Sequence, residues 1–181
     1  MNRELALRLI ERLWEAPEGT APDPVYALLD GARDPAIVPW IRRRALDHTC
    51  LFAGTLTPAL AAAAPYLVHL YRGEPFTREL VEKGWGRSWG VFVASPAGME
   101  PLRRHFRTFL RVRDERGRRL LFRYYDPRVL RVYLPTCSER ELDAVFGPVR
   151  HYFAEDGEPG TLLRFGRARP GLAATATPLA P

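Results

Sequence analysis

The sequence predicts an α/β fold in which a mixed β-sheet is flanked by helices, followed by a C-terminal lobe of a hairpin plus helices. Short apolar runs of strand length alternate with amphipathic stretches of helical period in the first half of the chain. Two further strand-like runs then bracket a turn that contains glycine, and helical stretches follow them. The length of 181 residues suits one domain or two small lobes that share a core.

The first half of the chain supplies most of the predicted elements. Leucines at helical spacing predict an amphipathic helix over residues 3–14, and the proline-rich stretch that follows is a linker. Strands are expected at residues 25–30, 49–53, 66–71 and 88–94. Between them we expect a helix over 34–46, a short alanine-rich helix opened by Thr57-Pro58, and a helix over 77–82. In the first of these, Asp34 is the expected cap, Pro35 lies in the first turn and Leu46 faces inward.

The second half begins with a predicted helix over residues 98–109, whose apolar stripe includes Leu102 and Phe106. Strands over 109–114 and 118–125 form the expected hairpin. The remaining elements are helices over 127–134 and 139–145, the latter capped by Ser138, and a strand pair over 149–153 and 162–165. The predicted organisation is an N-terminal helix and linker (1–24), a main domain (25–153, lobes 25–95 and 96–153), a terminal strand (154–166) and a disordered tail (167–181).

The N-terminal residues and the overall composition favour a cytoplasmic protein. The sequence begins with a charged amphipathic stretch rather than a signal peptide, and no apolar run reaches the length of about 18 residues that a membrane span needs. Its two cysteines, Cys50 and Cys137, lie far apart and outline no disulfide framework.

Motifs typical of enzymes are missing from the sequence. None of the three serines lies in a Gly-x-Ser-x-Gly elbow, and no glycine-rich phosphate loop is present. We therefore expect no catalytic residue, no metal and no cofactor. Two alternatives stay open: His48 and Cys50 share one face of a strand, as a thiol or metal pair would, although no second pair accompanies them. Asp30 and Asp34 lie at a strand end, where α/β sheets bind ligands, or they serve as turn and helix caps.

Residues 103–131 form the most basic part of the chain. They contain eleven arginines against three acids, a formal charge of +8, which exceeds the net charge of +6 for the whole chain. Arg111 and Arg113 alternate with apolar neighbours, as one solvated face of a strand would. This segment is a solvated face, a docking surface for an acidic protein, or a nucleic-acid site. The nearby aromatic residues could stack on bases in that last case: Phe122, Tyr124, Tyr125 and Tyr133.

Five fragments in order carry a resemblance to a known family. They are Tyr26–Pro35, Leu51–Thr55, Ala64–Val68, Leu121–Leu130 and Phe146–Pro148. Together they resemble the Tap/TEC-type effector adaptor/chaperones of the bacterial type VI secretion system, first catalogued as a domain of unknown function. The similarity covers about residues 25–153, and it includes the Arg-x-Tyr-Asp-Pro-Arg stretch at residues 123–128.

The resemblance implies a non-catalytic cytoplasmic protein with two protein partners. Such adaptors bind a secreted effector and help to load it onto a VgrG-type spike, and neither a membrane nor nucleic acid is an expected partner. The matching residues that could contact a partner, together with two from the basic segment, are Asp30, Arg33, Asp34, Arg111, Arg113, Arg123, Tyr125, Asp126 and Arg128. The motif at residues 123–128 is either an internal ion pair with a helix cap, or a set of binding anchors.

Overall fold

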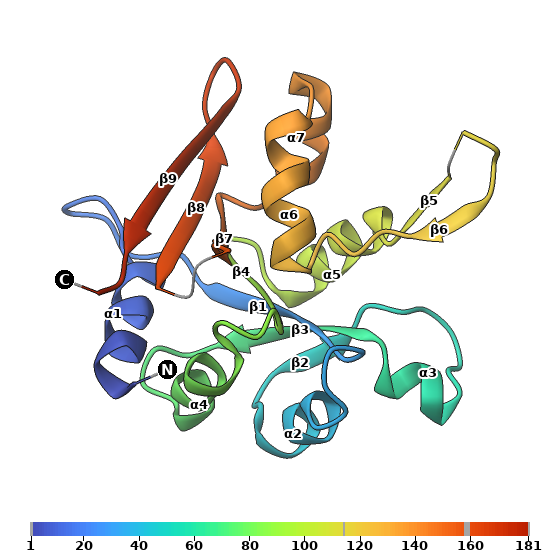
Figure 1. Cartoon of the computed structure of the whole chain (residues 1–181), viewed down its shortest axis with the longest axis horizontal. Coiled ribbons are helices and arrows are strands. Elements are labelled where there is room, and N and C mark those ends of the chain that lie inside the picture. The colour runs from blue at the N-terminus through green and yellow to red at the C-terminus, as the bar shows by residue number, and fades with distance from the viewer. Residues whose placement is uncertain (1, 114, 158–159, 181) are drawn as a thin grey trace.

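The computed structural model describes residues 2–113, 115–157 and 160–180, and its centre is a seven-stranded sheet with strand order β2-β3-β1-β4-β7-β8-β9 (Figure 1). The strands are β1 (Val25–Asp30), β2 (His48–Cys50), β3 (Pro65–Leu70), β4 (Gly90–Ala94), β7 (His151–Glu155), β8 (Thr161–Arg167) and β9 (Leu172–Pro178). The predicted α/β class is confirmed. Every strand pairing in the described residues is antiparallel, so the sheet is not the mixed one predicted from the alternation of strands and helices.

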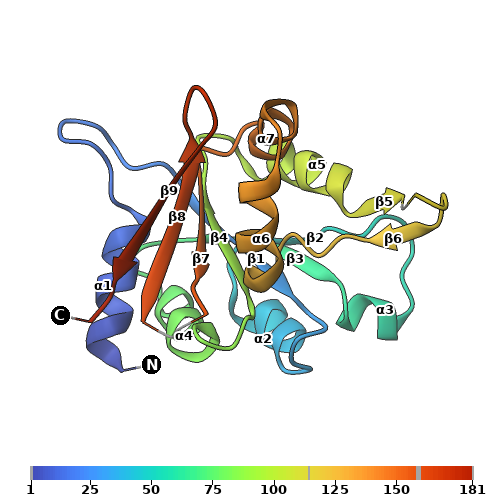
Figure 2. The same cartoon turned by 45° about the horizontal axis from the view of Figure 1, so that its top comes forward.

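Helices cover both faces of the sheet (Figure 2). One layer contains α1 (Arg3–Leu13), α2 (Ile37–Arg44) and α4 (Pro75–Gly84), and the other contains α5 (Met99–Phe109), α6 (Pro127–Tyr133) and α7 (Glu139–Phe146). The central strand β1 is buried on both sides, because Ala27 and Leu29 join the first core while Tyr26 and Leu28 join the second. This double burial explains why β1 is a continuous apolar run rather than an alternating one.

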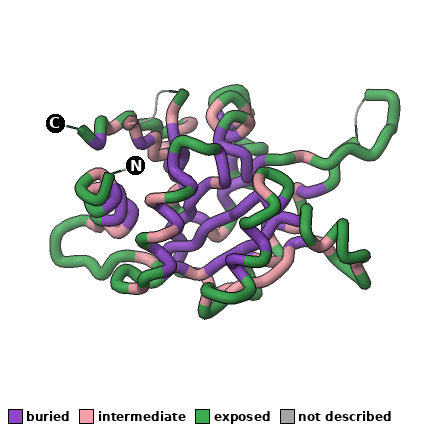
Figure 3. Tube along the Cα trace, turned by 60° about the horizontal axis from the view of Figure 1, so that its bottom comes forward, coloured by how far each residue is buried: buried purple, intermediate pink, exposed green. Residues whose placement is uncertain are grey.

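Two elements project from the same side of this three-layer body (Figures 1 and 2). One is the hairpin of β5 (Arg111–Arg113) and β6 (Arg119–Leu121), and the other is the short helix α3 (Pro58–Ala62). Figure 3 shows both as largely exposed, in contrast to the buried strands of the sheet. The hairpin strands are shorter than predicted, because residues 122–125 leave the ladder and turn into the body.

The prediction that residues 167–181 form a disordered tail is wrong for residues 167–180, and Pro181 lies outside the described residues. Residues 172–178 form β9, which pairs with β8 from Arg167↔Leu172 to Thr161↔Pro178, and Leu179 is buried. The predicted terminal strand over 154–166 is divided between the end of β7 and most of β8. Alanine and threonine bury little surface by themselves, but a strand of these residues satisfies the backbone groups along the outer edge of β8.

Two further predictions need correction. Asp34 does not cap a helix, because its Oδ1 accepts a hydrogen bond from the N–H of Ala36 in a turn, and α2 begins only at Ile37. Leu46 does not face inward, since it lies beyond the end of α2 and is 65% exposed. The segments predicted as lobes 25–95 and 96–153 share one sheet, because β4 pairs with β7.

Candidate functional site

The two motifs that the sequence singled out meet where β1 ends. Asp30 is only 1% exposed, and its Oδ2 lies 3.7 Å from Nη1 of Arg123. Its Oδ1 accepts a hydrogen bond of 2.9 Å from the N–H of Ala32, whereas Oδ2 accepts none within the described residues. Burial raises the pKa of Asp30, although the Ala32 N–H and the charge of Arg123 oppose this. We use the name buried junction for this site, in which the buried carboxylates of Asp30 and Asp126 meet the half-exposed side chains of Arg123 and Arg128.

Asp126 joins the start of α6 to the arginine that follows it. Its Oδ1 accepts hydrogen bonds from the backbone N–H of Arg128 at 3.0 Å and from Nε of the same residue at 2.9 Å. Nη2 of Arg128 donates to Oδ2 at 2.6 Å, which completes a bidentate ion pair. Burial alone would raise the pKa of Asp126, but the hydrogen bonds from Arg128 outweigh it and lower the pKa. Asp126 is therefore both the cap of α6 and an internal ion-pair partner.

The remaining matched residues have local structural roles. The ring of Tyr125 is buried, and burial raises the pKa of its hydroxyl group, with the negative charge of Asp30 adding to the effect. Nε of Arg33 donates to the carbonyl oxygen of Arg87 at 3.1 Å, and the positive charge of Arg33 acts to lower the pKa of both Asp30 and Asp126. These contacts favour the interpretation of the motif as an internal ion pair and cap over that of direct binding anchors.

Sequence reasoning missed a third buried acid, Glu155 in β7. Its carboxylate accepts hydrogen bonds from the N–H of Gly86 at 2.5 Å, from the N–H of Ser88 at 2.8 Å and from Oγ of Ser88 at 3.0 Å. Glu155 thus holds the loop before β4, in which Ser88 has a left-handed backbone with φ of 54°. The signal in the sequence was an acid that directly follows the apolar run Tyr152–Ala154.

The residues of the metal, thiol and aspartate alternatives are partly or fully buried. No group of three His, Cys, Asp or Glu side chains among them is placed to hold a metal ion. Cys50 is partly buried against the core. Separately, none of the helices in the described residues is long and apolar enough to cross a membrane. The burial of Asp30 leaves its carboxylate out of reach of a substrate, and Asp34 is engaged in its own turn.

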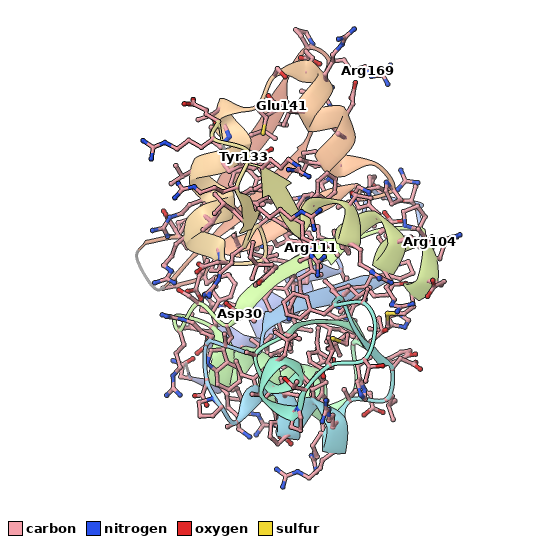
Figure 4. All side chains as sticks on the ribbon, turned by 90° about the vertical axis from the view of Figure 1, so that its right-hand side faces the viewer. Asp30, Arg104, Arg111, Tyr133, Glu141 and Arg169 are labelled. Atoms are coloured by element: carbon pink, nitrogen blue, oxygen red, sulfur yellow. The ribbon has the colours of Figure 1, made fainter. Side chains whose placement is uncertain are left out.

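A second feature lies between the hairpin and residues 52–60, where a groove of about 410 Å³ opens to solvent. We call it the hairpin groove, and it is lined by Phe52, Ala53, Thr55, Leu56, Leu60, Arg111, Arg119, Leu120 and Leu121. Figure 4 views the molecule from the side on which the hairpin projects, with Arg111 between Asp30 and Arg104. Of the two arginines singled out in β5, only Arg111 lines the groove, while Nη1 of Arg113 donates to the carbonyl oxygen of Gly117 in the turn.

The hairpin is exposed on both of its faces. All six residues of its two strands are exposed, and the aliphatic ones are Val112 at 39%, Leu120 at 46% and Leu121 at 44%. Arg111 and Arg113 are exposed to solvent, as the solvated-face interpretation expected, and Val112 between them is exposed as well. Because Leu120 and Leu121 are consecutive in a strand, they point to opposite faces, and the isolated hairpin buries neither of them.

The aromatic residues beside the basic segment are largely unavailable to bases. Tyr124 and Tyr125 are 2% and 1% exposed, and the hydroxyl group of Tyr124 donates to the carbonyl oxygen of Phe106 at 2.8 Å. Phe122 packs edge-to-face on Tyr133, with the ring centroids 4.7 Å apart. The expectation that these four rings could form a stacking platform is wrong for the two buried tyrosines.

Comparison with known proteins gives one result that bears on function. A family model described as "Domain of unknown function (DUF4123)" matches residues 25–144. No curated protein and no solved structure gives a significant match. The matched range begins at β1 and ends inside α7, so it contains the buried junction and the hairpin groove.

Proposed function

The chain belongs to the DUF4123 family, and on that premise we propose that it is a non-catalytic adaptor/chaperone of a type VI secretion system. In this proposal it binds a secreted effector in the bacterial cytoplasm and helps to load it onto a VgrG-type spike. The resemblance of the five sequence fragments to such adaptors supports the specific system. The structural support is for protein binding in general.

The observation that carries the proposal is the projecting hairpin. A two-stranded hairpin is at best marginally stable in water unless it packs against other structure. Here both faces of the strands are exposed, and the aliphatic side chains of Val112, Leu120 and Leu121 lie in the same two short strands as three arginines. Exposed apolar side chains grouped beside positive charge are typical of a surface that another protein covers.

The test is co-purification of the full-length chain, carrying an affinity tag, with the products of the genes beside it. Expression together should recover an effector at a one-to-one ratio, because an adaptor acts stoichiometrically. The complex should weaken as salt rises if the basic segment contributes to the contact. Recovery of no neighbouring protein by the folded chain would refute the adaptor function.

The charge of +8 on residues 103–131 supports one alternative, a nucleic-acid-binding domain. This alternative predicts binding to single- or double-stranded probes at about 50 mM salt, with an affinity that falls steeply as salt increases. The burial of Tyr124 and Tyr125 counts against it, because it removes two rings that could stack on bases. Absence of any shift of the probes at low salt would eliminate the alternative.

A further inference from the structure

We propose that the hairpin groove is the binding site for one partner segment, in which bulky apolar side chains alternate or cluster with aspartate or glutamate. This inference rests on the proposed function, since it takes the occupant to be part of the protein that the adaptor carries. It adds the location of the contact and the chemistry of the segment that fits there.

The walls of the groove require apolar anchors. Phe52, Leu56 and Leu60 line one side, and the hairpin lines the other, where Leu121 shares one face with Arg111 and Arg119. Among the described residues eight large apolar side chains are exposed, and four of them lie on the hairpin or on α3: Leu60, Val112, Leu120 and Leu121. A volume of about 410 Å³ falls within the range of sites that hold a few side chains rather than a whole domain.

The arginines at the groove require acids in the same segment. Arg111 and Arg119 line it, and neither has an acidic partner within the described residues. A chain that covers the leucines also removes water from these two guanidinium groups, which is unfavourable unless carboxylates replace the water. A purely apolar segment would therefore bind poorly, and a segment carrying lysine or arginine would be repelled.

The same charge argues against two other occupants. A second copy of this chain packed groove to groove would bring its own segment of +8 toward an identical one, and the like charges would repel. Nucleic acid would satisfy the arginines, but its phosphates would leave the leucines and Phe52 uncovered. Only an acidic segment with apolar anchors satisfies both kinds of side chain that line the groove.

The experiment uses the co-expressed complex of the full-length chain with the effector encoded beside it. A photoreactive amino acid is placed at Leu60 or Leu121, and in control proteins at Leu7 or Leu46, which are also exposed leucines but lie away from the groove. Irradiation should give a cross-link to the effector from the two groove positions and not from the controls. Mass spectrometry should map both cross-links to one effector segment that contains apolar and acidic residues.

Affinity measurements on the purified partners complete the test. The double variant Leu60→Ser/Leu121→Ser should raise Kd about 30-fold, the effect of losing a central anchor in an interface. Arg111→Glu/Arg119→Glu should also raise Kd and should flatten its salt dependence. The matched controls Leu46→Ser and Arg104→Glu, which change an exposed leucine and an exposed arginine elsewhere, should leave Kd within about twofold of the parent. Thermal unfolding of each variant verifies that it is folded.

The outcomes separate this inference from the function on which it rests. If the effector co-purifies but cross-links only through the control positions, or if the groove variants bind normally, the inference is overturned and the adaptor function stands. If the parent chain recovers no effector, both are overturned. A cross-linked dimer of this chain, a nuclease-sensitive adduct, or an effector segment without acids would each overturn the inference as well.

Discussion

Replacement of Asp126 by alanine should destabilise the fold by about 2 kcal/mol. The change removes the cap of α6, which contributes about 1 kcal/mol at a typical helix N-terminus. It also removes the bidentate ion pair with Arg128. Because the side chain of Arg128 is half exposed, solvent screening limits the contribution of this ion pair to stability to about 0.5–1 kcal/mol. For a chain of this length, a loss of about 2 kcal/mol corresponds to a decrease in Tm of about 4–8 °C.

The chain contains its own control for this experiment, because Asp34-Pro35 has the same two residues as Asp126-Pro127. Asp34 only holds a solvent-exposed turn, so Asp34→Ala should cost about 0.5 kcal/mol or less. Both free energies of unfolding can be measured by urea titration. Equal losses from the two substitutions, or a loss below about 0.5 kcal/mol for Asp126→Ala, would show that the cap and ion pair do not stabilise α6 as argued.

The direction of the pKa shift gives a second readout for Asp126. Its folded-state pKa is lowered, so its contribution to stability is fully present above the ordinary aspartate value of about 3.9 and is lost as pH falls through the folded pKa. The difference in unfolding free energy between the parent and Asp126→Ala should therefore narrow as pH decreases below about 4. A difference that stays constant over this range would contradict the assignment.

Three other substitutions or truncations test the fold. Gly90→Ala should cost about 3 kcal/mol by urea titration, because the added Cβ would lie 2.0 Å from the carbonyl oxygen of Leu28 in the adjacent strand; a near-neutral effect would contradict this packing. Glu155→Ala should cost about 2–3 kcal/mol and should speed hydrogen exchange in the loop before β4, where unchanged exchange would refute the anchoring role. Deletion of residues 171–181 should cost about 3 kcal/mol, since it removes β9 and the buried Leu179, whereas loss of a disordered tail would leave the unfolding midpoint unchanged.

The order of helices and strands was largely predictable from the sequence, because each element has a strong local signal. The apolar run of β1, the Leu102/Phe106 stripe of α5 and the cap of α7 at Ser138 are examples. In the last case the structure confirms a full capping box, with Glu141 bonding back to the N–H of Ser138. Such patterns do not encode which strands are neighbours, so the antiparallel directions and the strand order were not predictable from them.

The features that sequence reasoning missed depend on contacts between distant segments. Strand β9 gains its stability from the edge of β8 rather than from its own side chains. The cap at Asp126 is a local exception, because only this one of the three Asp-Pro pairs in the sequence is followed by an arginine, and Arg128 folds back onto the carboxylate. One wall of the hairpin groove comes from the irregular residues 52–57, which have no periodic pattern to predict where their side chains point.

The buried junction and the hairpin groove are linked through the chain, so the structural and binding roles of the 123–128 motif are compatible. The motif begins two residues after β6, and the N–H of Phe122 donates to the carbonyl oxygen of Leu110 at the base of the hairpin. Arg123 then contacts Asp30, and Tyr124 bonds to α5, so the base is fixed while the strands stay exposed. Removal of an ion pair in the junction should therefore lower stability and partner affinity together, whereas replacement of Leu121 by serine should lower affinity alone.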